Sequence, residues 1–220
     1  IYNEGAFNNN VGGIIKSDRS SSFGIYNLLG TFNNGAIINV GGIANVGNYA
    51  IQNNALFNNN AGGDIKMDRV STSGISLESS TFTNLGKVTI GEMLPISNLL
   101  TAISGTFSNN LGGILFGTGI IPASNFTNAG GTLSPGYSPG KMTFTTSSDF
   151  TNSTISMEAF SSGGIGGTNF DLMVITGTAT LGVSTNLNLK FSYAIECNTT
   201  FDMITATSVS GTIPTGNISF

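Results

Sequence analysis

The sequence contains no histidine and a single cysteine. Without histidine, the chain can build neither a histidine-dependent catalytic triad nor an imidazole metal site. Because Cys197 is alone, it can form neither an intrachain disulfide nor a cysteine-based metal site. Many hydrolase mechanisms are thereby excluded, and we expect no cofactor and no metal.

Charge is also scarce, because charged residues make up 8% of the 220 residues and the net charge is −4. An average protein has about a quarter of its residues charged. The seven lysines and arginines form no run, which argues against a nucleic-acid partner because such binding needs clustered positive charge. No apolar run reaches the roughly 18 residues of a membrane helix, so we expect no membrane insertion of this segment. The start at Ile1, inside a repeat, indicates a processed product or an excised piece of a longer protein.

What the chain does have is a repeat that includes a phenylalanine and, two residues later, an asparagine. Five phenylalanines recur at one constant interval, and two more follow at shorter intervals: Phe7, Phe32, Phe57, Phe82, Phe107, Phe126 and Phe150. The asparagines are Asn9, Asn34, Asn59, Asn84, Asn109, Asn128 and Asn152. A longer period is superimposed, since residues 1–24 closely match residues 51–74.

Short β segments separated by Gly and Asn turns fill each repeat. Three short strands in about 25 residues, without helical periodicity, are typical of one coil of a parallel β-helix. The sequence therefore predicts an all-β fold, a right-handed parallel β-helix with about 25-residue coils. We expect regular repeats over 1–124, and a less regular continuation or C-terminal cap module over 125–220.

Stacking explains the choice of residues. Each coil of a β-helix lies about 4.8 Å above the last, so equivalent side chains stack directly. We expect an aromatic column from the phenylalanines and a ladder in which each asparagine amide donates to the next. A buried amide without such partners costs roughly 1–3 kcal/mol.

The C-terminal part contains two Pro-Gly steps, in Leu133-Ser134-Pro135-Gly136 and Ser138-Pro139-Gly140, suited to type II turns. Segments with β-strand patterns follow at 141–146, 154–160, 170–176, 180–181 and 187–191. This stretch resembles the module with a G-G-T-L-S-P-G-x-S-P-G motif that ends the β-helix of many secreted or surface proteins of bacteria. The resemblance covers about 95 residues and includes 168–182 and 201–212.

The earlier repeats, 1–124, resemble haemagglutinin-like and autotransporter-passenger β-helices more generally. This resemblance implies an extracellular or cell-surface location and an adhesin-like role, and it transfers no catalytic residue. Cys197 departs from the family pattern of Gly, Pro and small residues, and we expect its thiol to be buried rather than reactive.

The residues that flank each buried phenylalanine must point outward, because strand side chains alternate between faces. These pairs are Thr31/Asn33, Thr81/Thr83, Thr106/Ser108 and Asn125/Thr127. They predict a neutral face of hydroxyl and amide groups, which is our candidate ligand-binding array, interrupted where Ala6/Asn8 and Leu56/Asn58 occupy the same positions. Such a face is suited to binding glycans, crystalline polysaccharide or ice, and an ordinary solvated strand face is the simpler alternative.

A β-helix polysaccharide lyase or glycosidase is the alternative function. Its candidate residues are a charged group and its copy two coils away: Lys16, Asp18 and Arg19, then Lys66, Asp68 and Arg69, with Asp64 nearby. Two coils correspond to roughly 10 Å, a carboxylate spacing that suits an inverting glycosidase. Repeated surface salt bridges explain the same residues. Asp18, Asp64 and Asp68 could instead hold Ca²⁺, although no dense acidic motif is present.

We therefore expect a non-catalytic structural or adhesive module of a secreted or cell-surface bacterial protein. Its expected partners are an extracellular glycan or surface, and further coils or copies that associate end to end.

Overall fold

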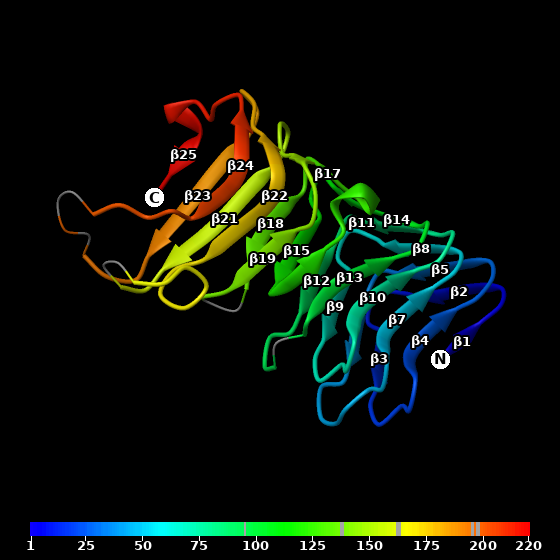
Figure 1. Cartoon of the computed structure of the whole chain (residues 1–220). Coiled ribbons are helices and arrows are strands. Elements are labelled where there is room, and N and C mark those ends of the chain that lie inside the picture. The colour runs from blue at the N-terminus through cyan, green and yellow to red at the C-terminus, as the bar shows by residue number, and fades with distance from the viewer. Residues whose placement is uncertain (95, 137–138, 162–163, 195, 197–198) are drawn as a thin grey trace.

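The computed structural model describes residues 1–94, 96–136, 139–161, 164–194, 196 and 199–220. Within these residues the chain forms strands β1–β25 and two single 3-10 turns, η1 (Ala123–Asn125) and η2 (Thr215–Asn217). The strands form three sheets, and each coil supplies successive strands to successive sheets. All pairs between named strands are parallel, as between β1 and β4 or β2 and β5. The predicted parallel β-helix is confirmed, and its two termini lie at opposite ends of the stack (Figure 1).

We call the three sheets A, B and C. Sheet A contains β1 (Tyr2–Asn3), β4 (Phe23–Asn27), β7 (Tyr49–Asn53), β10 (Ser73–Leu77), β13 (Asn98–Ala102), β16 (Gly119–Ile121), β19 (Lys141–Phe144), β20 (Ser148–Asp149), β22 (Leu172–Thr180) and β24 (Ile204–Ser210). Sheet B contains β2 (Ala6–Asn9), β5 (Thr31–Asn34), β8 (Leu56–Asn59), β11 (Thr81–Asn84), β14 (Thr106–Asn110) and β17 (Phe126–Ala129). Sheet C contains β3 (Ile14–Ser17), β6 (Ile37–Val40), β9 (Asp64–Met67), β12 (Lys87–Ile90), β15 (Ile114–Gly117), β18 (Thr132–Pro135), β21 (Thr154–Ala159), β23 (Asn186–Phe191) and β25 (Ile218–Ser219).

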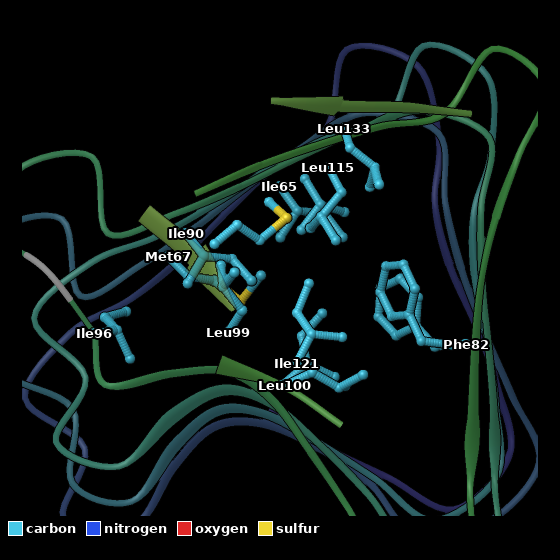
Figure 2. Packing of buried hydrophobic residues seen from close by; sticks show 14 of the residues in the cluster. Ile65, Met67, Phe82, Ile90, Ile96, Leu99, Leu100, Leu115, Ile121 and Leu133 are labelled. Atoms are coloured by element: carbon cyan, nitrogen blue, oxygen red, sulfur yellow. The ribbon is translucent and has the colours of Figure 1, made fainter. Parts of the chain in front are cut away.

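The core is a continuous apolar column enclosed by the three sheets. Figure 2 shows Phe82 pointing from sheet B toward Leu115 of sheet C and Ile121 of sheet A. These three side chains are at most 3% exposed. Buried and more exposed side chains alternate along strands such as β11 and β15, because every second side chain points into this column.

The phenylalanines of sheet B stack as predicted. From Phe7 to Phe107, successive ring centroids are 4.6 to 4.9 Å apart with interplanar angles of at most 19°. Phe107 and Phe126 extend the column at 5.8 Å. The prediction is wrong for Phe150, whose ring meets Phe144 edge-on at 5.3 Å rather than continuing the stack. Sheet B ends at β17, so no strand of that sheet carries Phe150.

The predicted asparagine ladder runs beside this column. Each Nδ2 donates to the Oδ1 of the next asparagine at 2.7 to 2.8 Å, from Asn9 through Asn34, Asn59, Asn84 and Asn109 to Asn128. The ladder ends at Asn128, whose Nδ2 donates to the carbonyl of Gly131 at 2.9 Å. Asn152 does not join the ladder, because it lies exposed in a turn.

A second interior ladder was not predicted. It joins Asn3 to Asn27 and Asn27 to Asn53 at 2.7 Å, on sheet A. Its spacings of 24 and 26 residues differ from the 25 residues of the sheet B ladder, because loops on either side of each coil vary in length. Both ladders satisfy amides that the core would otherwise leave unpaired.

The architecture changes after β17. Sheets A and C continue, while the nine residues of β22 pair first with β19 and then with β20. Strand β22 thus joins most of the predicted strand at 170–176 to the first residue of the strand predicted at 180–181. From here on, each coil contributes strands to sheets A and C only.

The two Pro-Gly steps are explained by a close backbone approach. A Cβ on Gly136 would lie 2.1 Å from the Cα of Gly140, and a Cβ on Gly140 would lie 2.2 Å from the Cα of Gly136. Only Gly136 has the positive φ, +76°, that a type II turn requires at this position. The type II prediction is therefore wrong for the second step, where Gly140 is needed for space rather than for its φ. Tyr137, Ser138 and Cys197 lie outside the described residues, so the predicted burial of the Cys197 thiol stays a prediction.

The interior ladder yields a stability prediction. Replacing Asn59 by Ala removes the acceptor for Asn34 Nδ2 and the donor for Asn84 Oδ1. We expect the free energy of unfolding to fall by roughly 2–4 kcal/mol, because each orphaned buried group costs about 1–3 kcal/mol. Urea unfolding measures this change. The control is Asn58→Thr on the outer face, where Thr83 already occupies the equivalent place, and it should change stability by less than about 0.5 kcal/mol. Equal losses in the two variants would contradict the ladder.

Candidate functional site

The predicted array lies on sheet B, in two columns of registered residues. The first column aligns Ala6, Thr31, Leu56, Thr81 and Thr106. The second aligns Asn8, Asn33, Asn58, Thr83, Ser108 and Thr127. All of these side chains are exposed or half-buried, whereas the phenylalanines between the columns and the asparagines that follow them are buried or, at Phe7 and Phe126, half-buried. The structure therefore brings Thr31, Asn33, Thr81, Thr83, Thr106 and Ser108 onto one outer face.

The amides of the second column order one another. Asn58 Nδ2 donates to Asn33 Oδ1, and Asn33 Nδ2 donates to Asn8 Oδ1, each at 2.8 Å. This outer ladder donates toward the N-terminus, opposite to the interior ladder of sheet B, which donates toward the C-terminus. The hydrogen bonds thus hold the side chains of Asn8, Asn33 and Asn58 in one orientation.

Three positions limit the array. Ala6 and Leu56 occupy the threonine column, as expected, so only Thr81 and Thr106 are consecutive hydroxyls in it. The expected pairing of Asn125 with Thr127 on the outer face is wrong. Asn125 belongs to turn η1, before β17 begins, and its Nδ2 donates to the carbonyl of Gly105 at 2.7 Å. Pro122 at the start of this turn is the local cause of the departure.

Four of the seven charged residues considered for the enzyme alternative line a hollow of about 240 Å³: Lys16, Asp18, Lys66 and Asp68. Lys16 and Lys66 are two strands apart in the register of sheet C, with Asn39 between them. Asp18, Asp68 and Glu92 supply carboxylates to the lining. The expected separation of two coils is confirmed, while Arg19, Asp64 and Arg69 are not among the residues that line the hollow.

Each carboxylate of the hollow has a structural partner. Asp18 Oδ1 accepts from the backbone N–H groups of Ile43 and Ala44, at 2.9 and 3.3 Å. Asp68 Oδ1 accepts from the N–H of Met93 at 2.9 Å. In both cases the aspartate anchors the loop of the following coil. Glu92 pairs with Lys66 at 3.7 Å, a partner that sequence analysis missed because the loop around it is not a copy of any other.

The arginines have backbone roles too. Arg19 and Arg69 both have a positive φ, 59° and 48°, at equivalent turns. Arg69 Nη1 donates to the carbonyl of Gly42 at 2.6 Å. Within the described residues, no three His, Cys, Asp or Glu side chains lie close enough together to hold a metal ion.

Asp171 is a carboxylate whose environment strongly perturbs its pKa. It is 1% exposed, and its two oxygens accept from the N–H groups of Gly140 and Glu158 at 2.8 Å each. Burial raises the pKa of Asp171 to about 7, against the opposing effect of these two hydrogen bonds. A perturbed pKa often marks a functional site, but these contacts give Asp171 a structural role: it joins the second Pro-Gly step to β21 and β22.

Comparisons with protein-family models, with curated proteins and with solved structures find no match to this chain. In the part of the chain that the structure describes, neither helical turn has the length or hydropathy to cross a membrane.

The buried Asp171 predicts a pH dependence. Because its folded pKa lies above its ordinary value of 3.8, the folded state binds the proton more tightly than the unfolded state. The stabilisation is present below about pH 4 and is lost as the pH rises through about 7, by up to ~4 kcal/mol for three pKa units.

Urea unfolding of the wild type and of Asp171→Asn between pH 4 and pH 8 isolates this contribution, since other groups contribute alike to both. The variant should be less stable at pH 4, because an amide offers one acceptor oxygen for two N–H donors. The difference in the free energy of unfolding between the variant and the wild type should shrink toward pH 8, because only the wild type loses the contribution of Asp171. Parallel stability profiles for the two proteins would show that Asp171 does not titrate in this range.

Proposed function

We propose that this chain is a non-catalytic structural and adhesive module of a secreted or cell-surface bacterial protein, which binds glycans or surfaces through the outer face of sheet B. The observation that supports it best is the registered array of neutral hydroxyl and amide side chains, in which Asn33 and Asn58 are hydrogen-bonded along the column. A ligand with repeating hydroxyl groups matches such a surface, since both repeat at a regular spacing.

The bacterial and extracellular parts of the proposal come from the sequence motif. The Leu-Ser-Pro-Gly and Ser-Pro-Gly steps resemble the module that follows β-helices in secreted and surface proteins of bacteria. The contact between Gly136 and Gly140, and the hydrogen bond from Gly140 to Asp171, give that motif a physical reason. Low charge and absent histidine agree with a non-catalytic role.

End-to-end association belongs to this proposal as well. Strands β1 and β2, and β3 of sheet C, each have a hydrogen-bonded neighbour on one side only. The half-buried Phe7 ends the aromatic column beside them. Edge strands of this kind pair readily with a further strand, so further coils or copies would extend all three sheets.

Ice or crystal binding is less well supported. A lattice needs uninterrupted regularity, and Ala6 and Leu56 break the threonine column at alternate coils. The polysaccharide lyase or glycosidase alternative has one favourable observation, the hollow that gathers Asp18, Asp68 and Glu92. Against it, these carboxylates are engaged by backbone N–H groups or by Lys66.

A glycan array with matched variants tests the proposal. Thr81→Tyr places a bulky ring in the middle of the array and should lower binding of the best glycan by about tenfold, equivalent to 1.4 kcal/mol. Asn186→Tyr is the control, because Asn186 is an exposed strand residue of sheet C. If both variants bind like the wild type, sheet B is not the binding face.

The non-catalytic part is tested separately, by incubating the protein with neutral and acidic polysaccharides and measuring new reducing ends and unsaturated products. We expect no turnover above the buffer rate. Turnover that is abolished in Asp68→Asn, with folding intact by circular dichroism, would replace the adhesive proposal with the enzyme alternative.

A further inference from the structure

A cluster of aromatic side chains lies on the outer face of sheet A, in the first three coils. It consists of Tyr2 on β1, Phe23 and Tyr26 on β4, and Tyr49 on β7, strands that lie side by side at the N-terminal end (Figure 1). Tyr2 is 60% exposed and the other rings are half-buried. Sequence analysis missed this cluster because its members do not recur at the constant interval of the sheet B phenylalanines. Register would have revealed it, since Tyr2 aligns with Tyr26 and Phe23 with Tyr49.

The rings form one continuous group. Tyr2 meets Tyr26 edge-on with a centroid distance of 5.5 Å, and Tyr26 meets Phe23 at 5.1 Å. Phe23 and Tyr49 are parallel at 6.0 Å, wider than the 4.6 Å between the interior rings of Phe32 and Phe57. Three successive strands give the cluster a length of about 10 Å along the axis.

Amides and carboxylates border the rings. Tyr2 Oη donates to Glu4 Oε1 at 2.9 Å, and Gln52 Nε2 donates to Asn54 Oδ1 at 2.8 Å. Asn54 Nδ2 lies 3.4 Å both from Tyr26 Oη and from Glu78 Oε2. Gln52 follows Tyr26 in the same column and is 4% exposed. Among the described residues, its Oε1 has no hydrogen-bond partner.

The aromatic character stops after the third coil. Beyond Gln52 the column continues with Ser76 and Thr101, and beyond Tyr49 it continues with Ser73 and Asn98. The cluster is therefore a bounded patch rather than a general property of sheet A. Interior packing does not require it, because Ile25 and Ile51 fill the core from the same strands and are fully buried.

We propose that Tyr2, Phe23, Tyr26 and Tyr49 form a binding platform for a neutral, β-linked polysaccharide chain. In such a chain, equatorial hydroxyl groups leave apolar C–H faces on the sugar rings, and aromatic side chains pack against these faces. Glu4, Asn54 and Glu78, which are exposed or half-buried, then receive or donate hydrogen bonds at the hydroxyl edges. This inference rests on the proposed glycan-binding function and assigns to it a second face, on sheet A.

The surroundings favour a neutral sugar over other partners. Glu4 and Glu78 place negative charge beside the rings, which disfavours acidic polysaccharides. A protein partner needs about 800 Å² on each side of a stable interface. An aromatic side chain contributes roughly 150–250 Å² when wholly buried, and three of these four rings are already half-buried, so the patch is too small for such an interface. A narrow chain of sugars fits its size.

Isothermal titration calorimetry with cellohexaose and chitohexaose tests the platform, with hexagalacturonate as the acidic comparison. Tyr26→Ala and Tyr49→Ala should each weaken binding of the better neutral probe by about tenfold, as expected for loss of one stacking ring. Tyr26→Phe and Tyr49→Phe keep the rings and should bind within about threefold of the wild type. Hexagalacturonate should bind less well than either neutral probe.

A further variant guards against misfolding. Tyr2→Ala changes an exposed side chain on an edge strand, so its thermal midpoint should match the wild type while its affinity for the probe falls. Wild-type affinity in all three alanine variants would overturn the platform. Equal loss in the alanine and phenylalanine variants would overturn it too, since hydroxyl groups rather than rings would then carry the binding.

The outcomes separate this inference from the proposed function. If the protein binds glycans and only Thr81→Tyr impairs binding, the adhesive function stands and the sheet A platform is wrong. If the protein binds no glycan on the array and neither neutral probe, both proposals fail. If the aromatic variants reduce self-association measured by sedimentation and the probes do not bind, the cluster is a protein contact and the platform is wrong.

Discussion

Vertical register between coils is the constraint on which the rest of this structure depends. Parallel strands place each residue about one strand spacing above its equivalent, so an interior aromatic or amide side chain can be stabilised by stacking on a copy of itself. Phenylalanine is stabilised by ring stacking, as between Phe57 and Phe82, and asparagine is stabilised by donating to the next asparagine, as from Asn59 to Asn84. The amide that would be costly alone becomes stabilising in a series.

The same register organises the outer faces and makes them different from one another. Sheet B presents hydroxyl and amide columns around Thr81 and Thr83, while the first coils of sheet A present the rings of Tyr26 and Tyr49. Beside sheet C, a hollow is lined by five charged side chains: Lys16, Asp18, Lys66, Asp68 and Glu92. Because the interior asparagines are satisfied by their own ladders, these surface columns can vary from coil to coil without cost to those ladders.

The constant period of the phenylalanines made the interior of sheet B predictable from the sequence, and the loss of that period limited prediction elsewhere. Phe32, Phe57 and Phe82 lie in one column as expected, whereas Phe150 and Asn152 do not join the series because sheet B ends before them. Alternation also placed Thr81 and Thr83 correctly, and it failed at Asn125, where a turn after Pro122 replaces strand. The ladder from Asn3 and the aromatic cluster were missed because unequal loops shift their spacing away from the period of sheet B.

The hydrogen exchange of the asparagine side-chain amides, measured by NMR, tests the central claim most directly. If the carboxamides of sheet B form a continuous interior ladder, the Nδ2 protons of Asn34, Asn59 and Asn84 will exchange orders of magnitude more slowly than those of Asn33 and Asn58 on the outer face. Each of the slow amides donates to the next one at 2.8 Å. Exchange of the interior amides as fast as that of the outer amides would contradict a stacked, closed ladder and the fold built on it.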